Sequence, residues 1–155
     1  MKERSVTHTT FVIERNYPSP VEKVYAAFSD PKKKRRWFIE GEGFSVTKFE
    51  TDFRVGGREY SEFTGDQPAK GATFTNETVF QDIVPNRRIV FAYTMAMNEK
   101  RISASLATIE LESEGKETKL VFTEQAAFFE GADGARMREQ GWKELLNQLA
   151  KELER

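Results

Sequence analysis

The chain has 155 residues and a net charge of −1, from 24 Lys and Arg against 25 Asp and Glu. This length predicts a single domain over residues 1–155 with a core of its own, and the balanced charge argues against a nucleic-acid-binding protein. The absence of cysteine excludes disulfides, thiolate nucleophiles and Cys-ligated zinc. The one histidine, His8, excludes a site of several imidazoles. We therefore expect no metal and no cofactor.

The apolar residues also bear on localisation. Residues 1–8 lack the apolar stretch of a signal peptide, and no apolar run approaches the length that spans a membrane. We expect a soluble cytoplasmic protein that does not insert into a membrane.

The first part of the chain predicts one strand followed by two short helices. Residues 9–17 alternate between apolar and polar side chains, as a half-buried strand does. Ser19-Pro20-Val21-Glu22 has the form of a capping box with proline at the first helical position. Asp30-Pro31 repeats this signal and predicts a second short helix over 32–36, ending at Trp37-Phe38.

The middle of the chain consists of short apolar segments separated by turn residues. Glycine and asparagine signals mark the turns at Gly56-Gly57, Pro85-Asn86, Asn98-Glu99 and Glu114-Gly115-Lys116, and residues 64–71 form a loop. Short turns join antiparallel neighbours, so we expect a meander. The predicted strands are 44–55, 58–63, 72–83, 89–97, 102–111 and 119–125.

The last segment predicts one long amphipathic helix over 133–152, with Asp133 as its N-cap. A helix with one apolar stripe needs one apolar partner surface, and the strand segment, rich in phenylalanine, offers it. The fold class is therefore α+β, with a curved antiparallel sheet of six to seven strands around one C-terminal helix. The stripe consists of Ala135, Trp142, Leu145, Leu146, Leu149 and Leu153.

Five motifs in this order resemble a known family across nearly the whole chain. They are Ser19-Pro20 with residues 21–28, Asp30-Pro31 leading to Trp37-Phe38, Phe53-Arg54-Val55-Gly56-Gly57, residues 83–91, and Gly141-Trp142 with Leu145, Leu146 and Leu149. The chain resembles the START/SRPBCC helix-grip superfamily, which includes the birch-pollen allergen type. It is most similar to the stand-alone subfamily named after the activator of the heat-shock-protein-ninety ATPase.

The resemblance implies a helix-grip fold with a cavity between the sheet and the helix for an apolar or amphipathic small molecule. It carries over no catalytic residue. One departure concerns the loop beside the cavity mouth. Similar sequences often have Gly-Pro after the Trp-Phe pair, whereas this chain reads Ile39-Glu40-Gly41.

The strand at residues 89–97 has large side chains at its odd positions and small ones at its even positions. Phe91, Tyr93, Met95 and Met97 therefore share the face that meets the helix. Core packing and a ligand cavity both fit this pattern, and the two methionines favour a cavity. The candidate ligand-binding residues are Trp37, Phe53, Phe74, Asn76, Phe91, Tyr93, Met95, Phe122, Glu124, Arg138, Trp142, Leu145, Leu146 and Leu149, and none is assigned a catalytic role.

Several polar residues share the inward face of these elements. Asn76 lies two residues after Phe74 and Glu124 two residues after Phe122, so in a strand each points to the same face as its phenylalanine. Arg138 lies on the apolar stripe of the helix. One hypothesis is a polar cluster of Glu124, Arg138, Asn76 and Tyr93 that orients a ligand head group. The alternative, which the cost of burying a charge favours, places both charges beyond the sheet edge in solvent.

Residues 32–36 are five consecutive cations. They fit a contact with an anionic partner, but the balanced total charge favours a solvated helix face. Trp37, beside them, fits either a gate at the cavity mouth or the core.

Three functions remain open. The first is a non-catalytic binder or carrier of a small apolar or amphipathic molecule. The second is a cavity enzyme of the polyketide cyclase or dehydratase type. The third is a protein-interaction module that resembles a co-chaperone. The lack of histidine and cysteine chemistry favours the first over the second, and only residues 32–36 offer a docking face for the third.

Overall fold

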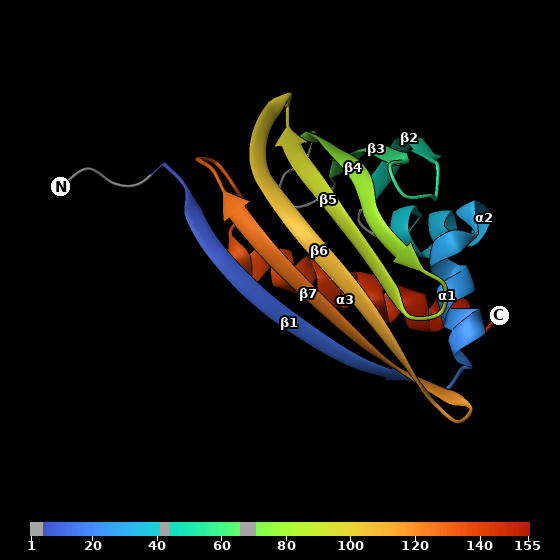
Figure 1. Ribbon diagram of the computed structural model, residues 1–155. Helices are drawn as coiled ribbons and strands as arrows, with labels where there is room; N and C mark the ends of the chain where they lie inside the picture. Colours follow the sequence, from blue (N-terminus) through green and yellow to red (C-terminus); the bar gives the residue numbers. More distant parts are fainter. Residues whose placement is uncertain (1–4, 41–43, 66–70) are drawn as a thin grey trace.

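The computed structural model describes residues 5–40, 44–65 and 71–155 (Figure 1). A first strand is followed by short helical segments, a run of strands and one long C-terminal helix. The elements are β1 (Thr7–Tyr17), α1 (Val21–Ser29), α2 (Pro31–Lys34), the π-helical turn η1 (Arg35–Ile39), β2 (Phe44–Thr51), β3 (Arg58–Gly65), β4 (Thr73–Val84), β5 (Arg88–Met97), β6 (Lys100–Glu114), β7 (Glu117–Phe128) and α3 (Ala135–Leu153).

The strands of the described ranges form one seven-stranded antiparallel sheet in the order β1-β7-β6-β5-β4-β3-β2. Strands β2 to β7 are a meander, and β1 pairs with β7 from Thr7 opposite Phe128 to Tyr17 opposite Thr118. The sheet is curved, and α3 crosses its concave side (Figure 1). The predicted α+β helix-grip class is confirmed.

Two helix starts differ from the prediction. Pro20, not Ser19, is the N-cap of α1, and the carbonyl of Ser19 accepts a hydrogen bond from the Thr118 hydroxyl. Gly134, at a φ of +87°, is the N-cap of α3, so the helix begins two residues after the predicted cap Asp133. The cap of α2 is confirmed, since the Asp30 carboxylate accepts from the backbone N–H of Lys32 at 2.9 Å.

The connection from β2 to β3 is longer than the two-residue hairpin predicted at Gly56-Gly57. Strand β2 ends at Thr51, and residues 52–57 fold back through the hydrogen bond from the Gly57 N–H to the Arg54 carbonyl. A Cβ on Gly57 would lie 2.1 Å from the Asp52 carbonyl oxygen, so only glycine fits there. The same loop pairs with β4, because the Phe80 N–H donates to the Gly57 carbonyl.

The apolar core lies between α3 and the half of the sheet nearest α1. The rings of Phe122 and Trp142 are 4.2 Å apart at their centroids, and Leu146 and Leu149 of α3 are fully buried. Trp37 is 2 % exposed and donates its indole N–H to the Ala27 carbonyl at 2.8 Å. Trp37 is therefore a core residue, and the gate interpretation is wrong.

Two cations of residues 32–36 form ion pairs across the fold. The Lys34 ammonium is buried 3.2 Å from the Glu59 carboxylate of β3, and Arg36 binds both carboxylate oxygens of Glu152 of α3 at 2.9 and 2.6 Å. The prediction of a solvated helix face is therefore wrong for Lys34 and Arg36. Opposite charges from distant elements lie close enough to compensate the desolvation of these cations.

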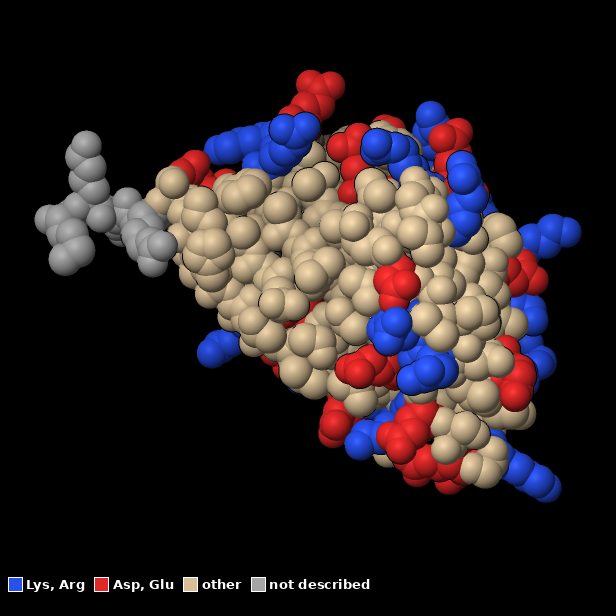
Figure 2. Space-filling model, in the orientation of Figure 1, with Lys and Arg blue, Asp and Glu red and all other residues tan. Residues whose placement is uncertain are grey.

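Figure 2 shows the face of the sheet that points away from α3. Charged side chains are sparse over its centre and gather toward its ends. Val12 of β1 and Leu106 of β6 are among the exposed large apolar residues. None of the helices in the described ranges is long and apolar enough to cross a membrane.

Candidate functional site

The inner face of the sheet changes from apolar to polar about halfway along the strands. In β3 to β6, two neighbouring rows of paired residues carry mostly polar side chains on this face. One row is Ser61, Asn76, Met95 and Ser103, and the next is Glu59, Thr78, Tyr93 and Ser105. Pairing brings these side chains within contact distance across the strands. A polar belt therefore crosses the face that meets α3.

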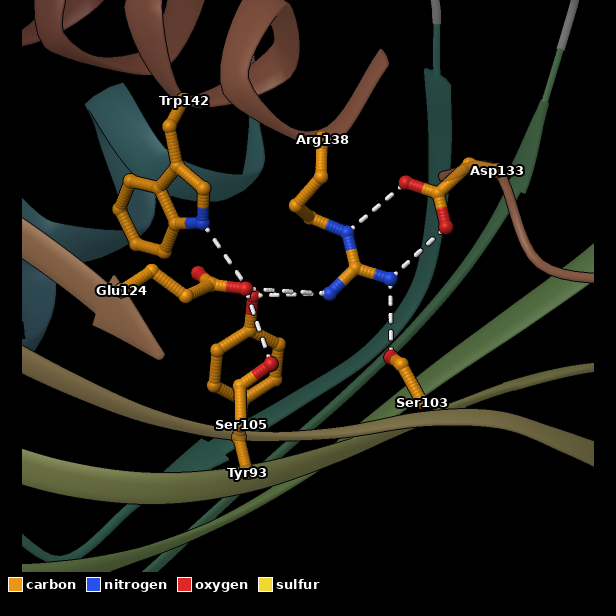
Figure 3. Close-up of polar contacts among 7 residues, drawn as sticks. All are labelled: Tyr93, Ser103, Ser105, Glu124, Asp133, Arg138 and Trp142. Carbon is orange, nitrogen blue, oxygen red and sulfur yellow. Dashed lines mark hydrogen bonds and ion pairs between the residues drawn. The ribbon is translucent and has the colours of Figure 1, made fainter. Parts of the chain in front are cut away.

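Seven residues form one hydrogen-bonded group in this belt, which we call the Tyr93 cluster (Figure 3). Strands β5, β6 and β7 supply four of them, α3 supplies two, and the segment before α3 supplies one. They are Tyr93, Ser103, Ser105, Glu124, Asp133, Arg138 and Trp142.

The Tyr93 hydroxyl lies at the centre of this cluster. It donates to the Glu124 carboxylate at 2.7 Å and accepts from Arg138 Nη1 at 3.1 Å and from the Trp142 indole N–H at 3.2 Å. The second oxygen of Glu124 accepts from the Ser105 hydroxyl at 2.9 Å. One phenol thus connects two strands of the sheet to α3.

Arg138 is the only cation of the cluster, and it is 6 % exposed. Its Nε and Nη2 each lie 2.8 Å from an oxygen of Asp133, and Nη2 also donates to the Ser103 hydroxyl. The Glu124 carboxylate lies 3.4 Å from Nη1. The bidentate pair with Asp133 is the strongest geometry available to a guanidinium, so α3 is fixed to the loop that precedes it.

Burial controls the protonation equilibria of the cluster. It raises the pKa of the Glu124 carboxyl, although nearby Arg138 favours the ionised form. Burial, together with the neighbouring Glu124, also raises the pKa of the Tyr93 phenol. Burial opposes the charge of Arg138, but Tyr93 and Asp133 outweigh it and raise the pKa of the guanidinium.

The sequence hypothesis of a polar cluster is correct for the positions of three residues. Glu124, Arg138 and Tyr93 are in contact and buried, so the alternative that places both charges in solvent is wrong. Asn76 lies in the neighbouring row, opposite Met95, and shares no hydrogen bond with the cluster. Its Oδ1 is buried and has no hydrogen-bond partner in the described structure.

The inner face beyond the polar belt is apolar and only half-buried. Phe74 and Met97 lie at this end, next to Met95 of the belt, and the centroids of the stacked Phe63 and Phe74 rings are 5.5 Å apart. The predicted ligand-binding residues therefore divide into two groups. Those in the buried core or cluster are Trp37, Phe91, Tyr93, Phe122, Glu124, Arg138, Trp142, Leu146 and Leu149. Those left half-buried are Phe53, Phe74, Asn76, Met95 and Leu145.

Sequence reasoning missed Ser61, Ser103 and Ser105, which are nearly fully buried on the inner face. The sequence does hold a signal for two of them. Ser103 and Ser105 lie four and two residues before Ala107 in the same strand, so all three side chains point to the same buried face. Asp133 was identified only as a cap, whereas its carboxylate binds Arg138.

Two hollows lie elsewhere on the described surface. One of about 870 Å³ is lined by residues such as Tyr60, Glu77 and Thr94, whose side chains point to the outer face of the sheet. Another of about 520 Å³ lies over β1, β6 and β7 near His8. Neither hollow lies between the sheet and α3, and none of the predicted ligand-binding residues lines them. The described side chains include no group of three or more His, Asp or Glu that suits a metal ion.

Comparisons with known proteins agree with this architecture. A solved structure from Rhizobium loti is 47 % identical, covers 96 % of this chain and 99 % of its own, and has a TM-score of 0.86. One from Rhizobium leguminosarum is 39 % identical with a TM-score of 0.91 and covers 99 % of both chains. One from Chromobacterium violaceum is 27 % identical with a TM-score of 0.77 and covers 94 % of this chain and 97 % of its own.

Among curated proteins, no match to the chain was found. The model of the family "Activator of Hsp90 ATPase homolog 1-like protein" matches residues 18–154. This range includes α1 to α3 and every residue of the Tyr93 cluster. The chain therefore belongs to this family and to the SRPBCC helix-grip superfamily.

Proposed function

We propose that the protein binds a small apolar or amphipathic molecule between α3 and the β3–β5 end of the inner face, as a binder or carrier without catalysis. The observation that carries this proposal is the Asn76 side chain. Its Oδ1 is buried without a hydrogen-bond partner in the described residues, beside the half-buried Met95.

An unpaired acceptor in such a place is a cost that native proteins rarely retain, since a buried polar group without a partner loses about 1–3 kcal/mol. A ligand that approaches Asn76 would supply the missing partner. Apolar walls with a few polar groups are also typical of small-molecule sites. The half-buried side chains of Phe74, Met95 and Met97 supply such walls.

The Tyr93 cluster supports a binder over an acid–base enzyme. Both oxygens of Glu124 and the hydroxyl of Tyr93 are already occupied by partners inside the protein. A general acid or base works best with a pKa near the operating pH, whereas burial moves the pKa of Tyr93 further above its ordinary value of 10.0. The internal hydrogen bonds of Glu124 and Tyr93 therefore favour a role in holding α3 against the sheet over proton transfer to a ligand.

The ion pairs of the basic segment reduce the support for a protein-interaction module. Lys34 and Arg36 are neutralised by Glu59 and Glu152 within the fold. A partner surface would therefore meet fewer free cations at residues 32–36 than the sequence suggests.

A thermal-shift screen with uncharged apolar and amphipathic compounds tests the proposal, because a ligand of the folded state raises the melting temperature. Met95→Trp fills the inner face and is expected to remove the shift. Thr94→Trp, on the adjacent residue that points to the outer face, is the control and is expected to keep it. Mass spectrometry of the recovered ligand is expected to show no turnover. A product, or an equal loss of binding in both variants, would contradict the proposal.

A further inference from the structure

The charged groups on the inner face already have partners. Arg138 is shared by Asp133 and Glu124, and Lys34 lies against Glu59. A ligand carboxylate would have to displace a bidentate Asp133, and a ligand ammonium would have to displace Arg138 or Lys34. Introducing a further charge here would leave one buried charge uncompensated, which is costly.

Three neutral polar side chains in the same belt, by contrast, form no side-chain hydrogen bond with other described residues. Ser61 is 2 % and Thr78 is 6 % exposed, and their hydroxyls take part in no side-chain hydrogen bond of the described residues. The Asn76 side chain forms no hydrogen bond with them either, and its Oδ1 is the buried side-chain atom that has no partner. Ser61 lies directly opposite Asn76, and Thr78 is the next inward residue of β4. Cβ atoms of such opposite pairs lie about 5 Å apart, so one small head group can reach them.

The chemistry of Asn76 restricts the head group further. Oδ1 only accepts hydrogen bonds, and the amide NH₂ only donates them. A hydroxyl can donate to Oδ1 and at the same time accept from the amide or from Ser61. An ether, a ketone or a carboxylate only accepts, so each would leave Oδ1 unpaired.

From these contacts we infer that the ligand is uncharged and inserts a hydroxyl group between Ser61, Asn76 and Thr78, with its apolar body toward Phe74 and Met97. This inference rests on the proposed function and names the class of ligand for that same site. The head group is held by neutral hydrogen bonds, while the Tyr93 cluster beside it stays intact.

Four compounds that share one ring system test this inference by calorimetric or fluorescence titration: naphthalene, 2-naphthol, 2-methoxynaphthalene and 2-naphthoate. We expect 2-naphthol to bind about tenfold more tightly than 2-methoxynaphthalene, which has the same oxygen but no donor. We expect 2-naphthoate to bind most weakly of the four. A preference for the carboxylate, or equal affinity for the naphthol and its methyl ether, overturns the inference. Binding of none of the four contradicts the proposed function itself.

Variants test whether the preference for 2-naphthol over its methyl ether depends on Asn76 and Ser61. Asn76→Leu keeps the approximate shape and removes the amide, so the affinity ratio of naphthol to methyl ether is expected to fall to about one while naphthalene still binds. Thr75→Val, on the adjacent outer-face residue of β4, is the matched control and is expected to keep the ratio. Ser61→Ala removes a single hydroxyl and is expected to lower the ratio severalfold, which gives a second test should Asn76→Leu fail to fold. An unchanged ratio in Ser61→Ala and in a folded Asn76→Leu overturns the assignment.

Discussion

The Tyr93 hydroxyl donates a 2.7 Å hydrogen bond to Glu124 across an intervening strand, since Tyr93 is on β5 and Glu124 is on β7. Arg138 and Trp142 of α3 donate hydrogen bonds to the same hydroxyl. The Tyr93 hydroxyl therefore connects two strands of the sheet to the helix. The Tyr93 hydroxyl is therefore one of the groups that hold α3 against the sheet.

Replacing Tyr93 by Phe removes the hydroxyl and leaves the ring. Glu124 and the Trp142 indole then each lose a partner, so we expect the free energy of unfolding to fall by about 1–3 kcal/mol. Urea denaturation measures this change. Tyr60→Phe, which removes a hydroxyl from the outer face, is the control and should cost less. Equal effects of the two variants would show that the central hydroxyl has no special role.

Replacing Arg138 by Met leaves Glu124 buried without a cation. Removal of one partner of a buried ion pair costs about 3–5 kcal/mol, so we expect a strongly destabilised protein with α3 less firmly held. Arg136→Met, at an exposed position of the same helix, should change stability by less than about 0.5 kcal/mol. Similar melting temperatures for both variants would contradict the role of Arg138.

Replacing Lys34 by Met tests the second buried pair. The ammonium lies 3.2 Å from Glu59 and 4.4 Å from the centre of the Phe38 ring, and both contacts are lost in the variant. We expect a loss of about 3–5 kcal/mol in urea denaturation, because Glu59 stays buried without its cation. Lys32→Met, at an exposed position of α2, is the control. If both lysines lay on a solvated helix face, Lys34→Met and Lys32→Met would change the free energy of unfolding equally.

The pH dependence of stability should reflect Glu124. Burial raises the pKa of this carboxyl above its ordinary value of 4.5, so the folded protein holds the proton more tightly than the unfolded chain does. Its contribution to stability is therefore complete below pH 4.5 and is lost as the pH rises through the folded pKa. Glu124→Gln removes this titration, and its unfolding free energy should decline less with rising pH. If the unfolding free energies of the variant and the wild type changed with pH in parallel, the pH dependence could not be assigned to Glu124.

The sequence predicted which face of each element points inward, because parity and helical period depend only on local geometry. This put Glu124 and Arg138 on the inward faces of their elements, but the cost of burying a charge favoured solvent for both, and the structure buries them. It did not show that Asp133 binds Arg138, because Gly134 takes the cap position and leaves the Asp133 carboxylate free for that pairing.

The contacts of Asn76 could not be predicted for a different reason. Its parity was correct, but its neighbours depend on the register of β4 against β5, which shifts between Phe80 and Asp82. Register is set by such irregularities and by turn geometry, neither of which the apolar pattern reveals. Asn76 consequently lies one row beyond Tyr93 and outside the cluster.

The most direct test of the account is to locate bound 2-naphthol in a crystal structure or by intermolecular NOEs. The account predicts the naphthol oxygen within hydrogen-bonding distance of the Asn76 amide and the rings against Phe74 and Met97, on the inner face of the sheet. A naphthol found instead in the outer-face hollow beside Tyr60 and Glu77 would contradict it.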